Sequence, residues 1–329
     1  MKQKHRGNLL FLFAVIGAMA APEANAAILT VGPTGKMYKT VASAVAAARD
    51  GDVLQVQAGT YTNDFAYVNK QISIVGVGGM ARMVATQNIP NGKGIFVTSK
   101  NITFDHIEFG GARVADANGA GIRYEGGNLT IEKCYFHDNE NGILANPVAA
   151  GSIVISNSEF ARNGRGDGYT HGLYVNKIAS LQVSNSYFHD TKVGHHIKSR
   201  ASSTTINGNR LVDGTNGTAS YNIDLPNGGV SVVTNNNIVQ SATSQNPALI
   251  HFGGEGTPYS NSSLRVGNNI LQNYRSSATG IVNHTSITVS ITSNKRYQLP
   301  TLASGPNTQS NNAVLTKPVP VDTTSPWLN

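Results

Sequence analysis

The sequence predicts an all-β fold, a single-domain parallel β-helix with a short N-terminal capping helix, and three observations support it. The chain of 329 residues has 35 glycines, 13% charged and 7% aromatic residues, a composition that suits a turn-rich β protein. A short apolar phrase recurs at intervals of about 23 to 33 residues. Only one segment has a convincing helical pattern, and it precedes the repeats.

The first 26 residues have the pattern of a secretory signal peptide. Lys2, Lys4 and Arg6 precede an apolar run over residues 9–21, and Ala24-Asn25-Ala26 supplies the small residues of a cleavage site. The apolar run is too short to cross a bilayer, so we expect no membrane span. The pattern predicts an exported protein, either secreted or periplasmic.

The predicted solenoid domain covers residues 27–300. A short strand at 27–31 is followed by a helix at 40–49, where Thr40 can act as N-cap. Residues 51–61 then have the pattern of a turn, a strand and a second turn. We expect the helix to cover the open end of the solenoid, because a bare terminal coil would expose apolar surface and an unpaired sheet edge.

The repeated phrase begins with an apolar residue, or with Thr204 or Ser231 in two copies, and places an apolar residue seven positions later. Because each copy buries only one or two side chains per face, the spacing favours stacked coils over a Greek-key sandwich. The phrase spans residues 102–109, 129–136, 153–160, 181–188, 204–211, 231–238 and 264–271. Asparagines inside or near these phrases suit left-handed turns and stacked ladders; they are Asn157, Asn185, Asn207, Asn209, Asn236 and Asn268.

Residues 301–329 form a C-terminal tail with a different composition. Prolines stand at 306, 318, 320 and 326 among Ser, Thr and Asn. Proline cannot donate a ladder hydrogen bond, so we expect this tail to leave the ladder and either to wrap around the outside or to lack order.

Charge and cysteine content narrow the classes of partner. The net charge of +7 favours acidic partners such as uronic-acid polysaccharides, anionic lipid surfaces or cell-wall polymers, although a simple solubility charge explains it equally well. A single cysteine, Cys134, excludes a disulfide within the chain. The sequence has no phosphate loop, no nucleic-acid-binding module and no His/Cys ligand spacing, so we expect no nucleic acid and no metal site of that kind, in a monomeric protein.

The most unusual stretch is Gly194-His195-His196-Ile197-Lys198-Ser199-Arg200. If it is extended, His196, Lys198 and Arg200 share one face, whereas His195 points to the interior with Ile197. We stack this segment on its neighbours with Val175, Ile197, Ile223 and Ile250 pointing inward. This register predicts one outward column of Glu125, Asn146, Asn176, Lys198, Asp224 and His251, and a neighbouring column of Tyr174, His196 and Asn222.

Three long turns should stand beside this face as substrate walls. The first, residues 163–172, carries Arg165, Asp167, Tyr169 and His171. The other two are residues 241–247 and residues 253–259, and the latter includes Glu255.

Two motifs indicate a family resemblance. The helix followed by Gly51-Asp52-Val53-Leu54-Gln55 is similar to the entry of the pectate-lyase-like right-handed β-helix proteins. The segment Ile197-Lys198-Ser199, followed by Ile206-Asn207-Gly208-Asn209, resembles the lysine-bearing coil of the alginate lyase and chondroitin lyase family. The resemblance implies a right-handed β-helix over residues 27–300. It also implies that Lys198 is the base that removes the proton beside the uronate carboxylate.

The chain departs from that family at two places. Thr191 and Val193 stand at the spacings of the carboxylates that hold calcium in the family, so the usual calcium ligands are not matched, and a dependence on calcium stays open. The next coil reads Ile223-Asp224-Leu225 where the family's arginine is expected. Arg200 and His196 can supply the missing positive charge, and His171 can transfer a proton near neutral pH.

The resulting hypothesis is a lyase that cleaves an acidic polysaccharide by β-elimination, which needs a base, a cation for the carboxylate and an acid for the leaving oxygen. The catalytic candidates are Lys198, Arg200, His196 and His171. The substrate-binding candidates are Asn176, Asp224, Tyr174, Asn222, Tyr169, Asp167, Arg165, His251 and Glu255.

Three alternatives stay open. A glycoside hydrolase would need clustered aspartates, but Asp167, Asp190 and Asp224 fall on separate coils. A uronate C5-epimerase would share the proton abstraction with a lyase. A non-catalytic surface protein would use the same face only to bind a glycan.

Overall fold

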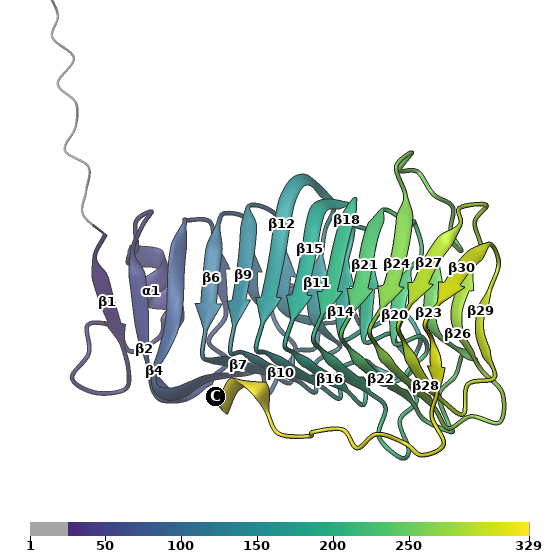
Figure 1. Cartoon of the computed structure of the whole chain (residues 1–329). Helices are drawn as coiled ribbons and strands as arrows, with labels where there is room; N and C mark the ends of the chain where they lie inside the picture. Colours follow the sequence, from purple (N-terminus) through teal and green to yellow (C-terminus); the bar gives the residue numbers. More distant parts are fainter. Residues whose placement is uncertain (1–25, 329) are drawn as a thin grey trace, which may run out of the picture.

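A computed structural model describes residues 26–328, and the chain forms a right-handed parallel β-helix (Figure 1). The strands of the described residues form one 21-stranded and one 10-stranded sheet, and the pairing between successive coils is parallel. The fold class predicted from the sequence is thus confirmed. The predicted signal peptide lies, apart from Ala26, outside the described residues.

The coils stack along the solenoid axis with three strand-bearing sides (Figure 1). The 21-stranded sheet supplies the first side, with β1 (Ile28–Val31), β2 (Val53–Thr62), β4 (Ile72–Val84), β6 (Ile102–Asp105), β9 (Asn128–Glu132), β12 (Val148–Ser156), β15 (Ile178–Ser184), β18 (Ser203–Asn207), β21 (Val230–Thr234), β24 (Ser263–Gly267), β27 (Val289–Thr292) and β30 (Asn307–Ser310). The same sheet continues onto the second side, with β7 (Ile107–Gly110), β10 (Tyr135–His137), β13 (Glu159–Ala161), β16 (Tyr187–His189), β19 (Arg210–Val212), β22 (Asn237–Gln240), β25 (Ile270–Asn273), β28 (Lys295–Tyr297) and β31 (Ala313–Val314).

The 10-stranded sheet forms the third side and carries the candidate site. Its strands are β3 (Ala66–Val68), β5 (Gly94–Thr98), β8 (Ala120–Tyr124), β11 (Asn141–Ala145), β14 (Leu173–Val175), β17 (Ile197–Ser199), β20 (Ile223–Leu225), β23 (Ala248–Phe252), β26 (Thr279–Asn283) and β29 (Thr301–Ser304).

The repeated phrase sets the register of the first two sides as predicted. Leu129 pairs with Ile102 and Ile153 at the start of the phrase. Phe136 pairs with Phe109 and Phe160 at its end. Rings of successive buried phenylalanines stack with centroids 4.6, 4.6 and 4.4 Å apart, from Phe109 to Phe188. Each ring therefore covers the one below it, which is how a coil that is too small to bury its own core becomes stable.

Asparagine has two separate uses at the corner between the first and second sides. Asn157, Asn185 and Asn268 have φ between 48° and 57°, the left-handed conformation that asparagine tolerates. Asn209, Asn236 and Asn269 form a buried ladder, in which Oδ1 of Asn236 and Oδ1 of Asn269 each accept hydrogen bonds from the asparagine one coil before. Both uses were predicted for the set of Asn157, Asn185, Asn207, Asn209, Asn236 and Asn268. Asn269 was not among these residues, and Asn207 serves neither use.

The helix α1 (Val41–Ala47) lies at the N-terminal end of the solenoid beside β2 (Figure 1). Oγ1 of Thr40 accepts a hydrogen bond from the backbone of Ser43, as expected for the N-cap. The carboxylate of Asp64 also accepts hydrogen bonds from the backbone N–H groups of Val41 and Ala42. Val41, Ala44 and Val45 are buried, so the helix protects the first coil.

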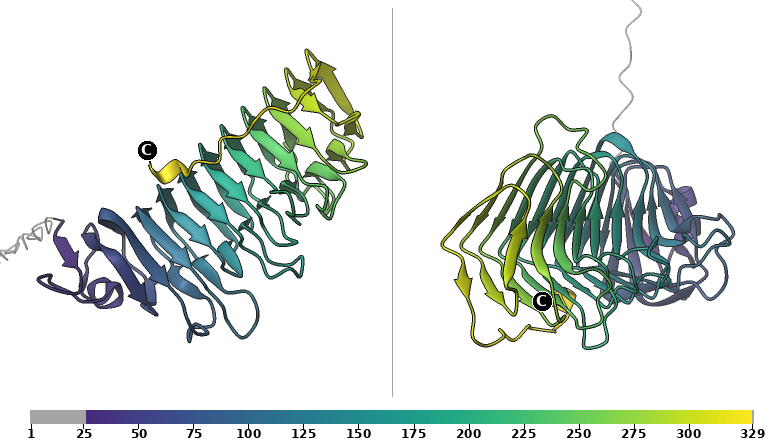
Figure 2. Two further views of the ribbon diagram at one scale, coloured as in Figure 1. Left: turned by 90° about the horizontal axis from the view of Figure 1, so that it is seen from below. Right: turned by 90° about the vertical axis from the view of Figure 1, so that its right-hand side faces the viewer.

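The ladder extends beyond residue 300, where the sequence led us to expect its end. Strands β29, β30 and β31 continue all three sides as far as Val314. Pro306 is compatible with this because it lies between β29 and β30, where no ladder N–H is needed. The rest of the tail then runs back along the outside of the second side, as one of the two expectations had it (Figure 2). It ends in a 3-10 helix, η1 (Pro326–Leu328), near β13. No helix within residues 26–328 is long and apolar enough to cross a membrane.

Candidate functional site

A column of polar side chains runs along the outward face of β14, β17, β20 and β23. In the paired register, Tyr174 stands next to Lys198, Lys198 next to Asp224, and Asp224 next to His251. The predicted order Lys198, Asp224, His251 is confirmed. The predicted neighbour of Lys198 on the other side, Asn176, is wrong, and Tyr174 occupies that position.

The error is a slip of two residues in the register of β14. Leu173, and not Val175, pairs with Ile197. Because side chains alternate with a period of two, this slip keeps Lys198 on the outward face but replaces its neighbour. Asn176 comes after the end of β14 and accepts a hydrogen bond from the backbone of Lys177, so it belongs to a turn.

Asp224 is the buried centre of the cluster, with 2% of its surface exposed. Its Oδ2 lies 2.8 Å from Nζ of Lys198 and 3.3 Å from Nε2 of His195, and its Oδ1 lies 2.7 Å from Nδ1 of His251. Burial disfavours the charged carboxylate, but the hydrogen bond from His251 and the charges of His195 and Lys198 outweigh burial and lower the pKa of Asp224. The ionised carboxylate can only accept, so Nδ1 of His251 carries its proton and Nε2 carries a lone pair when the ring is neutral.

His195 does not point into the core as predicted; it lies on the outer side against Asp224. Its Nδ1 accepts a hydrogen bond from the backbone of Tyr221, which places the proton of the neutral ring on Nε2. Burial lowers the pKa of His195 to about 4, although Asp224 opposes that shift.

His171 stacks on His195 with ring centroids 4.8 Å apart and accepts the backbone N–H of His195 at Nδ1. Burial and the neighbouring charges of His195 and Lys198 hold the pKa of His171 well below its usual range. Its ring also stacks on that of Tyr174. His171 is therefore a neutral imidazole that presents a donor, Nε2–H.

His196 and Asn222, predicted in an outward column, are both buried. His196 is fully buried, with Nδ1 2.8 Å from Oγ1 of Thr191 and Nε2 3.3 Å from Oδ1 of Asp213. Asn222 donates to the backbone of Val239. His196 lies just before the start of β17, and Asn222 lies just before the start of β20. The alternation of side chains along a strand therefore does not apply to these two residues.

Arg200 is on the same face and has a carboxylate partner from a distant loop. Its Nη1 lies 2.6 Å from Oε2 of Glu255, and its Nη2 lies 3.0 Å from Oε1. Nε donates to the hydroxyl of Tyr174 at 3.1 Å, and Nη1 donates to Oδ1 of Asn227 at 2.5 Å. Lys198 lies 3.4 Å from the same Glu255 carboxylate. Glu255, predicted only as part of a substrate wall, therefore joins the cluster through Arg200 and Lys198.

The first long turn contributes only His171 to this cluster. The carboxylate of Asp167 accepts hydrogen bonds within its own loop, from Tyr169 and Thr170. Arg165 lies 3.5 Å from Glu140 in a separate pocket of about 340 Å³. Tyr169 is 87% exposed at the tip of the turn. These three predicted binding residues stand at the rim and outside the Asp224 cluster.

The residues at the implied calcium positions do not fit calcium. Calcium prefers several oxygen ligands, but the hydroxyl of Thr191 is committed to His196, and Val193 has no side-chain oxygen. In residues 26–328, no group of three or more His, Cys, Asp or Glu side chains is placed to hold a metal ion.

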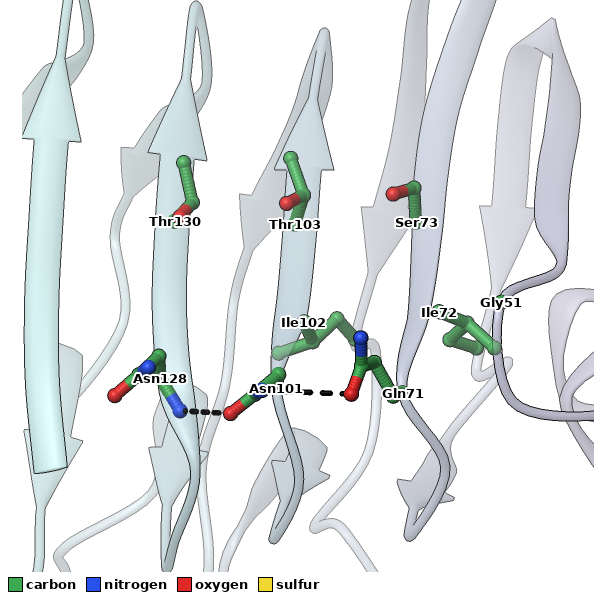
Figure 3. A pocket seen from close by; sticks show the side chains of 9 residues that line it. All are labelled: Gly51, Gln71, Ile72, Ser73, Asn101, Ile102, Thr103, Asn128 and Thr130. Atoms are coloured by element: carbon green, nitrogen blue, oxygen red, sulfur yellow. Dashed lines mark hydrogen bonds between the residues drawn. The ribbon is translucent and has the colours of Figure 1, made fainter.

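A second polar pocket, of about 240 Å³, lies on the first side near the N-terminal end (Figure 3). Asn101 joins Gln71 and Asn128 across three coils through hydrogen bonds, and Ser73, Thr103 and Thr130 stand beside this row. None of the lining side chains can exchange a proton near neutral pH. The pocket therefore lacks the groups that acid–base chemistry requires.

Sequence reasoning missed Tyr221, Asn227 and Tyr259. Tyr221 stacks between His195 and His251, with ring centroids 5.3 and 4.5 Å away. A signal existed, because His171, His195 and Tyr221 each stand two positions before an inward residue once the register is correct. Asn227 and Tyr259 gave no such signal, since both act through contacts between coils.

Comparison with known proteins agrees with this architecture. No curated protein sequence matches the chain. Among solved structures, pectate lyase Pel9A is 15% identical, with a TM-score of 0.52 over 88% of this chain and 78% of that one. The ORF18 protein of Geobacillus virus E2 is 15% identical, with a TM-score of 0.60 over 84% and 59%. An alginate lyase from Paenibacillus sp. str. FPU-7 is 14% identical, with a TM-score of 0.54 over 87% and 99%.

At these identities the solved structures establish a shared fold and no more. The family described as "Right handed beta helix region" matches residues 72–238. This match includes the repeated phrases as far as residues 231–238 and the strands β14, β17 and β20 that carry most of the polar cluster. The chain is therefore a member of the right-handed β-helix family.

Proposed function

We propose that this protein cleaves a uronate-containing polysaccharide by β-elimination. The observation that carries the proposal is the pair of partly buried cations, Arg200 and Lys198, that holds a carboxylate beside the Asp224–His251 pair. The reaction requires neutralisation of the substrate carboxylate, removal of the proton on the adjacent carbon, and protonation of the leaving oxygen. The names of the similar solved structures, a pectate lyase and an alginate lyase, support this class of substrate.

In this proposal, Arg200 and Lys198 neutralise the substrate carboxylate. The guanidinium fork matches the two carboxylate oxygens, and its side chain is only 16% exposed. Lys198 already forms ion pairs with the carboxylates of Asp224, at 2.8 Å, and Glu255, at 3.4 Å. We therefore assign to Lys198 the role of a cation instead of the role of base that the sequence suggested.

The base in this assignment is Nε2 of His251. Asp224 holds the proton on Nδ1, as a carboxylate does in other Asp–His pairs, and leaves the Nε2 lone pair available. Nε2 takes the proton from the carbon beside the carboxylate, the electron pair forms the C=C bond, and the bond from the β-carbon to the glycosidic oxygen breaks.

The acid in this assignment is the hydroxyl of Tyr174. Nε of Arg200 donates to its oxygen, so the phenol hydrogen is free to move to the leaving oxygen and the guanidinium stabilises the resulting phenolate. The Nε2–H of His171 is the hydrogen-bond donor that orients this part of the substrate. The signal-peptide pattern of residues 1–26 supports an exported protein, in which such a polymer would be accessible.

The test is to incubate the protein with alginate, polygalacturonate, chondroitin and hyaluronan and to follow absorbance at about 235 nm, where the unsaturated product absorbs. We expect a rise with at least one polymer and its loss in Lys198→Ala. Lys192→Ala is the matched control, because Lys192 is exposed and outside the cluster. New reducing ends without absorbance would show hydrolysis, and inversion at C5 without chain cleavage would show epimerisation. Either result would contradict the proposal, as would retained binding without any reaction.

A further inference from the structure

We propose that the loop between β23 and β24 is a lid that occupies the carboxylate subsite with its own Glu255, and that an acidic sugar must displace Glu255 to bind. This inference rests on the proposed function for the identity of the sugar class. The subsite itself consists of Arg200, Lys198 and Asn227, which come from two other coils.

The partners of this contact differ in exposure. The side chains of Arg200 and Lys198 are 16% and 12% exposed, whereas that of Glu255 is 48% exposed. The two cations thus belong to the solenoid, whereas the anion that binds them, Glu255, comes from a solvent-facing loop. A negative partner stabilises a partly buried positive charge, and Lys198 keeps Asp224 in either state, so the subsite can hold Glu255 or another carboxylate against Arg200.

The loop has features that permit it to open. Gly253 and Gly256 have φ of 77° and 87°, and residues 254–258 are exposed. Outside the carboxylate contact, the loop is anchored by the N–H of Glu255 on the carbonyl of Pro226 and by Asn227, which donates to the carbonyl of Glu255. The hydroxyl of Tyr259 also donates to the carbonyl of Arg200 at 2.7 Å. A solvent-facing segment held by a few hydrogen bonds opens at lower cost than the core strands.

The same loop also covers the assigned base. A Cβ atom added to Gly254 would lie 2.3 Å from Nε2 of His251. In the closed position, the backbone of Gly254 therefore leaves no space for a sugar against Nε2. Displacement of Glu255 would clear the carboxylate subsite and the base together.

A neutral sugar has nothing to offer the two cations in exchange for Glu255. An acidic sugar replaces one carboxylate by another, so the charge balance of the subsite is kept. The lid would therefore select for anionic sugars beyond the attraction that the cations alone provide.

The experiment compares the wild-type protein with Glu255→Gln by calorimetric titration with trimannuronate, trigalacturonate and the neutral sugar maltotriose. The amide keeps the shape but leaves Arg200 without a carboxylate, while Lys198 keeps Asp224, so we expect the acidic trisaccharide to bind about 3- to 10-fold more tightly and maltotriose to bind as before. Glu125→Gln is the matched control, because that carboxylate pairs with Lys93 at 2.5 Å outside the cluster. Unchanged or weaker binding of both acidic trisaccharides to Glu255→Gln would overturn the lid.

A second variant, Gly254→Ala, opens the loop without a change in charge and should also tighten binding of the acidic sugar. Thermal unfolding of each variant establishes that it is folded. Because the readout is binding, the two proposals can fail separately. If the acidic trisaccharides bind more tightly to Glu255→Gln but no unsaturated product forms, the lyase proposal fails and the lid proposal stands. If the protein forms an unsaturated product but its affinity does not change with either substitution, the lyase proposal stands and the lid proposal fails.

Discussion

The guanidinium of Arg200 binds both oxygens of the Glu255 carboxylate, at 2.6 and 3.0 Å, although 55 positions separate the two residues in the chain. Arg200 follows β17, whereas Glu255 follows β23, two coils further along the solenoid. The solenoid thus assembles an anion subsite from segments that are distant in sequence. Its residues can be tested individually.

Arg200→Lys should raise KM for the uronate polymer. Lysine keeps the charge but loses the fork that binds two oxygens at once, and the loss of one charge-assisted hydrogen bond corresponds to roughly a 10- to 100-fold effect. Steady-state kinetics provides the measurement. Arg162→Lys is the control, since Arg162 donates two hydrogen bonds to the carboxylate of Asp138 at a place outside the cluster. If KM is the same in both variants, Arg200 does not bind the substrate carboxylate.

Asp224→Asn should lower kcat by at least about 100-fold, because the amide no longer fixes the tautomer of His251 and leaves Lys198 without its closest anion. The comparison is Asp213→Asn, which changes a buried carboxylate next to His196. That variant should lower the thermal midpoint and leave kcat unchanged. Equal kcat values in the two variants would contradict the role of Asp224.

Acidification should destabilise the protein through His195. Its folded pKa of about 4 lies below the ordinary value of 6.5, so between these values the unfolded chain binds a proton that the folded chain does not. The contribution is fully present above pH 6.5 and is lost as the pH falls to 4, on the order of 3 kcal/mol. Urea unfolding of wild type and His195→Asn at pH 7, 5.5 and 4 should give converging free energies. Parallel curves would refute this prediction.

Phe160→Ala should destabilise the solenoid by about 3–5 kcal/mol, the usual cost of a cavity left by a buried aromatic ring. Phe160 is fully buried and stacks on Phe136 and Phe188, so the cavity would interrupt the column in its middle. Tyr169→Ala removes a ring that is 87% exposed and should change the free energy of unfolding by less than about 0.5 kcal/mol. Equal effects in the two variants would argue against the ring column as a source of stability.

Asn236→Asp should cost at least about 3 kcal/mol, although the two side chains have the same shape. Nδ2 of Asn236 donates to the carbonyl of Ile206 and to Oδ1 of Asn269, both of which a buried carboxylate would repel. Asn185→Asp changes an exposed corner residue with φ of 49°, a conformation that aspartate tolerates. It should unfold at nearly the wild-type urea concentration, and a loss equal to that of Asn236→Asp would exclude the ladder as the cause.

The sequence was sufficient for the fold because a solenoid repeats a local rule. The residues seven positions apart, from Ile102 and Phe109 onward, pair one coil above another as predicted. The helix at Thr40 and the left-handed asparagines also follow from local chemistry. The C-terminal boundary was wrong because one proline at a corner, Pro306, does not interrupt a ladder.

At the site, the sequence determined that Lys198, Asp224 and His251 share a column, because the period of two survives a register slip. Only the tertiary structure decided that Tyr174 replaces Asn176, that His196 is buried and that His195 faces Asp224. It also brought Glu255 onto Arg200. Turn geometry and contacts between coils set these positions, and neither is encoded in the alternation of side chains along a strand.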